Sequence, residues 1–196
     1  DDQVRAVRTN QGEYPADIVV VCTGVKPNTD FLAEAGFERL ANGALVVDRQ
    51  GRTSVANVWA AGDCATVWHS VKQQQVYVPL ATIANKLGRL VGENVAGAAL
   101  EFPGTLASAA LKVLDLEAGR TGLSEREAEQ LGVNYRTVLI KDKCHTNYCH
   151  GQSDIHVKLI YEATSKRLLG AQIIGRKGAV HRVNSLAVAI SMGVTT

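Results

Sequence analysis

The stretch Thr53-Ser-Val-Ala-Asn-Val-Trp-Ala-Ala-Gly-Asp63, followed by Cys64 and Ala65, indicates the fold more clearly than any other segment of the chain. Its valines, alanines and tryptophan predict a buried strand. Gly62 lacks a side chain where the backbone would approach a neighbour closely, and Asp63 then places a carboxylate at the end of that strand. A carboxylate in this place suits the hydroxyl groups of a sugar and does not suit a phosphate. The alternative is a core strand that ends in an ordinary turn, because Gly-Asp is a common turn pair.

The composition is that of a globular protein with one large domain or two smaller ones. The chain has 196 residues, of which 46% are hydrophobic, and its formal net charge is +2. This charge gives no basic field, so we expect no nucleic-acid partner. The longest apolar runs fall far short of the ~20 residues that span a bilayer, and no signal peptide pattern is present. The four cysteines lack the density of a disulfide scaffold, which favours a cytoplasmic setting.

Alternating and continuous apolar runs predict strands in the first half of the chain. Alternation over residues 4–8 and the turn after them predict an antiparallel pair that leads into a fully buried strand at residues 16–22. Further strands are expected at residues 44–47 and 57–61. Because the chain begins inside this strand pattern without Met, we expect a fragment of a longer protein.

Two helices are expected in the same half. A short one covers residues 30–35, with Asp30 as its cap. Apolar residues three and four apart predict a longer helix over residues 79–94 that packs on one face. Gly88 and Gly92 would let this helix approach its neighbour closely.

The second half of the chain predicts an α+β domain. It follows a loop at residues 97–104, where small residues, a proline and a glycine mark a domain boundary. Residues 107–116 form one long strand or a strand pair, and residues 120–123 a turn. Ser124 and Glu127 predict a capping box at the start of a short helix. The remaining elements are strands at residues 134–141, 155–161 and 167–174, the last two as a hairpin, and a closing helix at residues 179–192.

A series of motifs in this order resembles the FAD-dependent pyridine nucleotide-disulfide oxidoreductases. Residues 16–29 resemble the segment that leaves the nicotinamide-nucleotide domain, and residues 57–65 resemble the second flavin-binding motif. Residues 77–89 resemble the helix that follows that motif. The dimerisation domain of the family is resembled by residues 120–128, 158–161 and 168–175. The order of the motifs points to the branch that contains CoA-disulfide reductases, NADH oxidases and NADH peroxidases.

The resemblance implies a homodimeric flavoprotein oxidoreductase of which this chain is the C-terminal portion. Residues 1–29 would end the NAD(P)-binding domain, residues 30–102 would complete the FAD-binding domain, and residues 103–196 would form a truncated dimerisation domain. Such an enzyme passes a hydride from NAD(P)H through FAD to a redox-active cysteine, which would lie upstream of Asp1. The terminal acceptor would be a small molecule: a disulfide such as CoA disulfide, a peroxide or oxygen.

The chain alone lacks part of what such an enzyme needs. It contains no Gly-x-Gly-x-x-Gly, so the loop that would seat a dinucleotide pyrophosphate is missing. We therefore expect the fragment alone to be inactive. Two alternatives remain: a non-catalytic dimerisation module, or the flavin reductase segment of a larger electron-transfer protein.

The expected cofactor-binding residues lie in two segments. By the resemblance, Gly62 and Asp63 form the ribityl site of FAD, with the Asp63 carboxylate accepting hydrogen bonds. Pro79, Leu80 and Ala81 would direct free backbone amides toward the pyrimidine edge of the flavin, because proline suits the first turn of a helix. The alternative for this corner is an ordinary helix start.

The expected substrate-binding residues are Asn85, Lys86 and Arg89, on or near one turn of the same helix. The resemblance assigns them to the phosphates of coenzyme A. The alternative is a solvated helix face, which is where cationic side chains commonly lie.

The candidate catalytic residue of this chain is Tyr148. In CoA-disulfide reductases a tyrosine near this place reaches across the dimer toward the partner's reactive cysteine, where its hydroxyl can donate to a thiolate. The neighbouring Cys149 and His150 depart from the Tyr-Tyr-Pro-Gly pattern of those enzymes.

Cysteines and histidines near this tyrosine invite a zinc interpretation, in which Cys144, His145, Cys149 and His150 would bind one ion. Adjacent strand residues point to opposite faces, so we expect instead a buried structural Cys144, a surface loop and no metal. Neither Cys22 nor Cys64 is assigned as the reactive cysteine, because each would end a buried strand.

Overall fold

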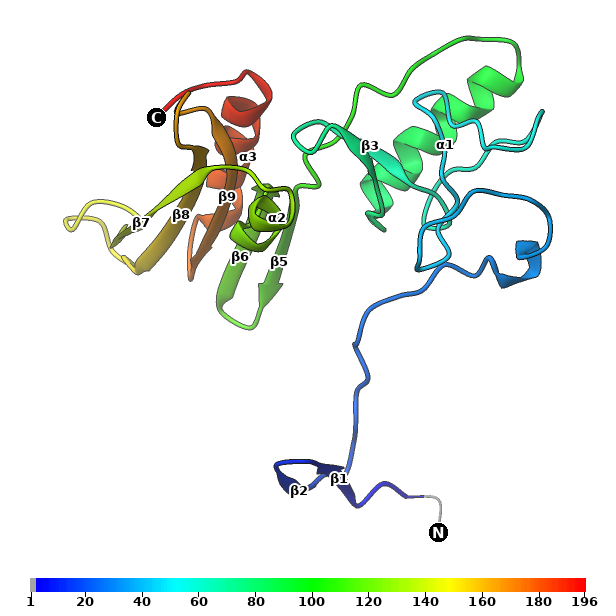
Figure 1. Ribbon diagram of the computed structural model, residues 1–196. Coiled ribbons are helices and arrows are strands. Elements are labelled where there is room, and N and C mark those ends of the chain that lie inside the picture. The colour runs from blue at the N-terminus through cyan, green and yellow to red at the C-terminus, as the bar shows by residue number, and fades with distance from the viewer. Residues whose placement is uncertain (1–2) are drawn as a thin grey trace.

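The computed structural model describes residues 3–196 and contains a small hairpin and two larger units. Strands β1 and β2 form the hairpin, which stands at the end of an extended segment, away from both units (Figure 1). The elements are β1 (Ala6–Thr9), β2 (Gly12–Pro15), the 3-10 helix η1 (Asp30–Leu32), β3 (Val67–His69), β4 (Gln74–Val76), α1 (Ala81–Val95), β5 (Ala109–Val113), β6 (Leu116–Gly122), α2 (Glu125–Gln130), β7 (Tyr135–Lys143), β8 (Asp154–Glu162), β9 (Leu168–Gly175) and α3 (Ala179–Ser191).

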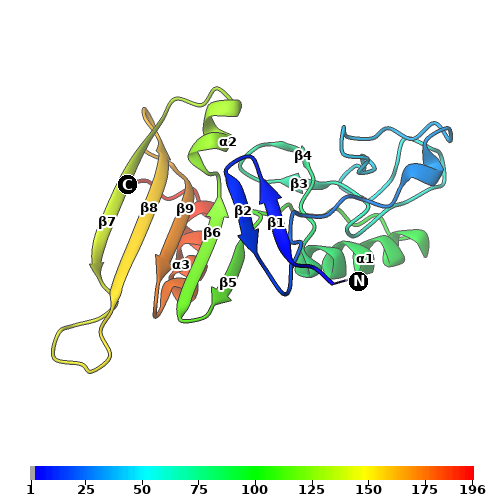
Figure 2. The ribbon, with the colours of Figure 1, turned by 90° about the horizontal axis from the view of Figure 1, so that it is seen from below.

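The second unit is an antiparallel sheet with strand order β5-β6-β9-β8-β7, and α3 packs on one of its faces (Figure 2). Ile155 and Ile173 point to this face and pack against Ala179 and Val183 of α3. The opposite face carries apolar side chains that the described residues leave exposed. These are Leu111, Val113, Leu116, Leu139 and Ile174.

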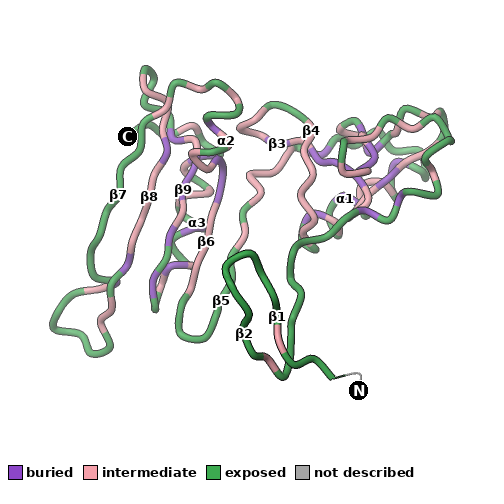
Figure 3. Tube along the Cα trace, turned by 60° about the horizontal axis from the view of Figure 1, so that its bottom comes forward, coloured by how far each residue is buried: buried purple, intermediate pink, exposed green. Residues whose placement is uncertain are grey.

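The first unit packs loops and the short β3–β4 hairpin against α1. The helix buries Ile83 and Leu87 against Val67 and Phe102, as its apolar spacing predicts. A second cluster of loop residues, centred on Leu45, lies beside it. Figure 3 shows buried residues in the α1 unit and in the sheet, whereas the residues of β1, β2 and β7 are largely exposed.

The two units meet at the turn between β3 and β4. Val71 packs against Leu123, Ala128 and Ile160 of the second unit. Next to it, the Lys72 ammonium lies 2.8 Å from a carboxylate oxygen of Glu127. Apolar packing of Val71 and one ion pair of Lys72 therefore join the turn to the second unit.

The structure contradicts the buried strand predicted at residues 16–22. This segment has no secondary structure, and Ile18, Val20 and Val21 are 82%, 78% and 77% exposed. A strand needs a neighbour to satisfy its backbone, and no strand within residues 3–196 pairs with this segment. Cys22 is exposed for the same reason, so the buried position predicted for it is also wrong.

Two further predicted strands reduce to isolated bridges. Leu45 bridges to Ala65, and Arg52 bridges to Trp59. Asn57 has a φ of 62°, which interrupts an extended run at the first residue of the predicted strand 57–61. The apolar residues of these segments still enter the core, but as loops.

The predicted helix at residues 30–35 is a single 3-10 turn, η1. Its N-cap is Thr29, and Asp30 caps nothing but pairs with Lys26 at 2.8 Å. The longer helix begins at Ala81 and not at Pro79.

Most predictions for the second unit are confirmed. Residues 107–116 belong to a strand pair, β5 and β6, and β8 and β9 form the expected hairpin. In the capping box, the Ser124 hydroxyl accepts from the Glu127 N–H, and the Glu127 carboxylate accepts from the Ser124 N–H. The turn predicted at residues 120–123 is wrong, because β6 continues to pair with β9 as far as Gly122.

The close helix approach predicted from Gly88 and Gly92 is also wrong. A Cβ added at either position would meet no atom within 4 Å outside the helix's own backbone. We therefore expect Gly88→Ala to stabilise the chain by about 0.5 to 1 kcal/mol, because alanine loses less conformational entropy in a helix. Urea unfolding followed by circular dichroism measures this change. A lower unfolding midpoint would contradict the open space around Gly88.

Candidate functional site

The turn that carries Asp63 lies against the first turns of α1. Gly62 has a φ of 88°, which favours glycine, and a Cβ at this position would lie 3.7 Å from the Cβ of Ala84. The Ala65 N–H donates to the Gly62 carbonyl at 3.0 Å and closes the turn. The glycine is therefore required by backbone conformation, and the close backbone approach expected from the sequence does not occur there.

Asp63 presents a free carboxylate at this turn. The residue is exposed, and no hydrogen bond or ion pair within residues 3–196 involves its side chain. It follows a loop and not the buried strand that the sequence predicts. The carboxylate can accept hydrogen bonds from a ligand without breaking any bond to the described part of the protein.

Tyr77 is a candidate ligand-binding residue that the sequence does not reveal. Its hydroxyl oxygen is buried and finds no hydrogen-bond partner within residues 3–196. Burial raises the pKa of Tyr77, and the nearby carboxylate of Asp63 raises it further. A buried hydroxyl without a partner is uncommon, and it leaves a donor beside the free acceptor of Asp63.

The start of α1 lies beside this pair. Leu80 is the N-cap, no side chain caps the helix, and the Leu80 carbonyl accepts from the amides of Ile83 and Ala84. Pro79 and Leu80 are half-buried and precede the helix, so Pro79 does not occupy its first turn. Ala81 is the first helical residue, and its backbone belongs to the end of the helix that favours negative charge.

The predicted substrate-binding residues lie on the exposed side of α1. Asn85, Lys86 and Arg89 are all exposed, and Asn85 and Arg89 are one helical turn apart. Within residues 3–196, the side chains of Lys86 and Arg89 take part in no ion pair. The two cations are therefore available to an anion, as the coenzyme A assignment requires, but they are equally consistent with a solvated face.

Tyr148 lies far from this site within the chain. It is 82% exposed in the loop between β7 and β8, at the end of the sheet that points away from the α1 unit (Figures 1 and 2). The structure therefore does not bring Tyr148 and Asp63 together.

The cysteines and histidines of the same loop do not form a metal site. No group of three potential ligands converges anywhere in the described part of the chain. Cys144 is buried, as expected, and its sulfur lies 3.0 Å from Nδ1 of His145, whereas Cys149 is exposed. In the first unit, the half-buried Cys64 donates its S–H to the Ala61 carbonyl at 3.3 Å.

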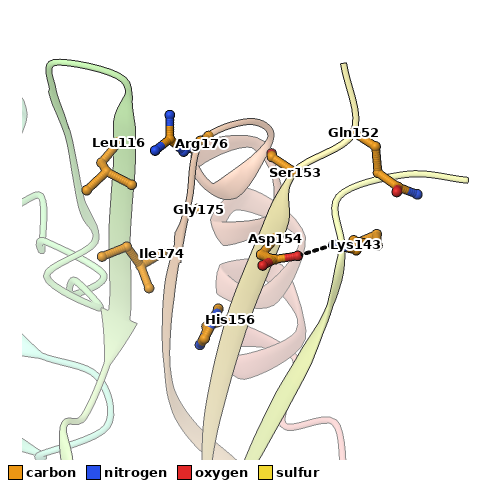
Figure 4. Close-up of a pocket in the computed structure, with 9 residues that line it drawn as sticks. All are labelled: Leu116, Lys143, Gln152, Ser153, Asp154, His156, Ile174, Gly175 and Arg176. Atoms are coloured by element: carbon orange, nitrogen blue, oxygen red, sulfur yellow. Dashed lines mark hydrogen bonds and ion pairs between the residues drawn. The ribbon is translucent and has the colours of Figure 1, made fainter. Parts of the chain in front are cut away.

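A hollow of about 520 Å³ lies at the open end of the sheet, but it contains none of the predicted site residues (Figure 4). Its charged side chains are already paired, Lys143 with Asp154 and Arg176 with Asp115. This hollow is therefore a poor candidate for an anion site.

Comparisons with known proteins agree with the fold of both units. The profile described as pyridine nucleotide-disulphide oxidoreductase matches residues 1–88, and that of the family's dimerisation domain matches residues 108–196. The chain is 40% identical over 195 residues to the NAD(P)H sulfur oxidoreductase (CoA-dependent) of Pyrococcus furiosus, covering 100% of this chain and 44% of that protein.

Solved structures give the same result. The NAD-dependent persulfide reductase from A. fulgidus superimposes with a TM-score of 0.91 at 39% identity, covering 100% of this chain and 36% of that one. An FAD-dependent pyridine nucleotide-disulphide oxidoreductase from Desulfovibrio vulgaris superimposes with a TM-score of 0.82 at 30% identity, covering 98% of this chain and 46% of that one. The chain thus spans less than half the length of these relatives.

Among residues 3–196, every helix is too short or too polar to cross a bilayer. Matches along both units, in the order that the motifs predict, show that the chain belongs to the pyridine nucleotide-disulphide oxidoreductase family.

Proposed function

We propose that this chain is the C-terminal portion of a flavoprotein that passes a hydride from NAD(P)H through FAD to a sulfur acceptor. The observation that carries the proposal is the free carboxylate of Asp63 beside the buried, unpartnered hydroxyl of Tyr77. The relatives named for sulfur and persulfide reduction support a disulfide or persulfide as acceptor, with CoA disulfide as one example. Peroxide and oxygen remain the other acceptors to test.

The residues present fit the sugar-like chain of FAD. Asp63 would accept hydrogen bonds from ribityl hydroxyls. The bound cofactor would also give the buried Tyr77 hydroxyl the hydrogen-bond partner that it lacks. Of the corner Pro79 to Ala81, only the Ala81 N–H is free for the pyrimidine edge, because Pro79 has no N–H and the Leu80 N–H donates to the Val78 carbonyl at 2.9 Å. FAD, when bound, supplies the two-electron chemistry, while these residues orient it.

The residues present do not fit the pyrophosphate of a nicotinamide nucleotide. The chain lacks the glycine-rich loop, and residues 17–25 are exposed and form no strand. We assign residues 1–29 to the end of an NAD(P)-binding domain, residues 30–102 to an FAD-binding domain and residues 103–196 to a dimerisation domain. NAD(P)H and the reactive cysteine would be held by other parts of the protein.

The remaining assignments concern substrate and partner. Lys86 and Arg89 would bind the phosphates of coenzyme A through their positive charges, and Asn85 would add the N–H groups of its side-chain amide. Tyr148 would donate its hydroxyl to a thiolate of the second subunit in a homodimer, and its exposure leaves it available for this. The protein would act in the cytoplasm.

A second candidate function is a dimerisation module without catalysis. It is favoured by the exposed apolar face of the sheet, which includes Leu111, Leu139 and Ile174 and lines a hollow of about 520 Å³. Purified chain that is dimeric and colourless would support the module, whereas bound flavin would support the first proposal.

The flavin assignment predicts how substitutions change FAD affinity in the complete flavoprotein. We expect Asp63→Asn to raise the dissociation constant of FAD about tenfold or more, because a hydrogen bond to a charged group contributes about 1.5 to 3 kcal/mol. Tyr77→Phe should raise it by a smaller factor, about two- to tenfold. Titration of apoprotein with FAD measures both changes.

Glu93→Gln is the matched control, because Glu93 is an exposed carboxylate near the other end of α1. Its FAD affinity should equal that of the wild type. A dissociation constant of FAD that is unchanged in Asp63→Asn would show that the Asp63 carboxylate does not bind the flavin.

A further inference from the structure

Cys144 forms a cluster of polar contacts where β7 ends, in the second unit. Its sulfur lies 3.0 Å from Nδ1 of His145. It also accepts from the Ser153 N–H at 3.3 Å and from the Ser153 hydroxyl at 3.5 Å. An imidazole and two donors around one sulfur is the arrangement that activates a thiol, because the imidazole can take its proton and the donors stabilise the thiolate.

The surroundings of Cys144 are also positively charged. Arg182 donates to the Cys144 carbonyl at 2.6 Å, and Ala179, the first residue of α3, packs against the Cys144 side chain. The hydrogen bond from Ser153 lowers the pKa of Cys144 against the opposing effect of burial, and Lys177 adds a favourable charge. The two donors of Ser153 and the charge of Lys177 therefore stabilise the thiolate.

His145 has an unused nitrogen. Its Nε2 atom is buried and has no hydrogen-bond partner within residues 3–196. No other group in the described chain therefore fixes which nitrogen of the ring carries a proton. This leaves Nδ1 able to take the proton of Cys144, and a buried nitrogen without a partner marks a place that a further polar molecule can occupy.

Access to the Cys144 sulfur is limited by burial, because Cys144 is only 5% exposed. Cys22 and Cys149, in contrast, are exposed, and neither has an imidazole bonded to its sulfur. A bulky disulfide would reach these two cysteines more easily than Cys144. A peroxide is small and carries hydrogen-bonding oxygens.

We propose that Cys144 and His145 form a nucleophilic thiol–imidazole pair that reacts with hydrogen peroxide, at a site separate from the flavin chemistry. His145 takes the thiol proton, and the thiolate attacks one peroxide oxygen. The S–O bond forms as the O–O bond breaks, and the leaving hydroxide receives the proton from His145 and becomes water. Cys144 is oxidised to a sulfenic acid, and the peroxide is reduced.

The test compares the cysteines of one protein. The purified chain is treated with hydrogen peroxide, sulfenic acids are trapped with dimedone, and each cysteine is quantified by mass spectrometry over time. We expect Cys144 to react at least about tenfold faster than Cys22 or Cys149, because general acid–base catalysis contributes about 100-fold or more and the burial of Cys144 offsets part of that gain. A Cys144 that reacts no faster than these exposed cysteines would overturn the proposal.

Two variants test whether the imidazole of His145 is what makes Cys144 reactive. His145→Asn keeps a polar group near the sulfur but no base, and it should slow oxidation of Cys144 by about 100-fold or more, whereas the rate at Cys149 should not change. Cys149→Ser should leave the rate at Cys144 as it is. An unchanged rate at Cys144 in His145→Asn would contradict the role of the imidazole.

Unfolding the wild-type chain in urea gives a measurement that does not depend on any variant folding. Once the contacts of Cys144 are lost, its rate should fall to that of Cys149. A rate that stays high in urea would show that local sequence, and not the folded cluster, activates Cys144.

Discussion

Replacing Gly170 by alanine should destabilise the second unit by about 3 kcal/mol or more, or prevent it from folding. Gly170 lies in β9, between β6 and β8 in the centre of the sheet. A Cβ at this position would lie 1.9 Å from the carbonyl oxygen of Leu123 and 2.6 Å from its nitrogen. Both atoms belong to the backbone, so the clash cannot be relieved by a side-chain rotation.

Urea unfolding followed by circular dichroism tests this expectation. Gly88→Ala is the matched control, because it is the same substitution at a glycine with open space around it. The two variants should shift the unfolding midpoint in opposite directions. A Gly170→Ala chain with a wild-type midpoint would show that the Leu123 backbone does not crowd β9 at this position.

Glu127→Gln should cost about 2 to 4 kcal/mol of unfolding free energy, because this carboxylate joins three structural contacts. It completes the capping box with Ser124, pairs with Lys72 at 2.8 Å and pairs with Arg120 at 2.7 Å. The side chains of Lys72 and Glu127 are only 15% and 21% exposed, so a lost partner leaves a poorly solvated charge. Glutamine can still accept from the Ser124 N–H, so the variant should weaken the contact between the two units, through Lys72, more than it weakens α2.

Glu125→Gln is the control in the same helical turn. Glu125 pairs with Lys158, but both side chains are about one-third exposed, so the loss should stay below about 1 kcal/mol. Equal effects of the two substitutions would contradict the role assigned to Glu127.

The ionisation of Glu127 should make the unfolding free energy depend on pH. Burial opposes ionisation of Glu127, but hydrogen bonds from Lys72 and Ser124 and the charge of Arg120 lower its pKa from 4.5 to about 2. A lowered pKa stabilises the folded state above pH 4.5, and this stabilisation is lost as the pH falls toward 2. In Glu127→Gln, the unfolding free energy should therefore change less over this interval than in the wild type.

The second unit could be predicted from sequence because its signals are local. The alternation in β8 and β9 occurs in two strands joined by a short turn, so each strand has its partner nearby. The capping box of α2 lies within four residues. Residues 16–22 carry an equally strong apolar pattern, but a strand forms only where another strand pairs with it, and the pattern does not state where the partner is.

The candidate site could be predicted in part for a related reason. The turn at Gly62 and Asp63 follows from residue types that suit a positive φ and a polar loop. Tyr77 could not be found in this way, because its unpartnered hydroxyl depends on how segments far apart in sequence pack. The contact between Cys144 and His145 could not be predicted from strand geometry, because adjacent side chains diverge in a strand, whereas here the strand ends at Lys143.

The most direct test of the proposed function is anaerobic titration of the complete flavoprotein with NADH or NADPH, followed by the visible absorbance of FAD. We expect the nicotinamide nucleotide to bleach the flavin, and we expect a disulfide or persulfide acceptor added afterwards to restore its absorbance. A protein that purifies without flavin, or whose flavin stays oxidised in excess NADH and NADPH, would contradict the proposal that this chain belongs to a hydride-transferring enzyme.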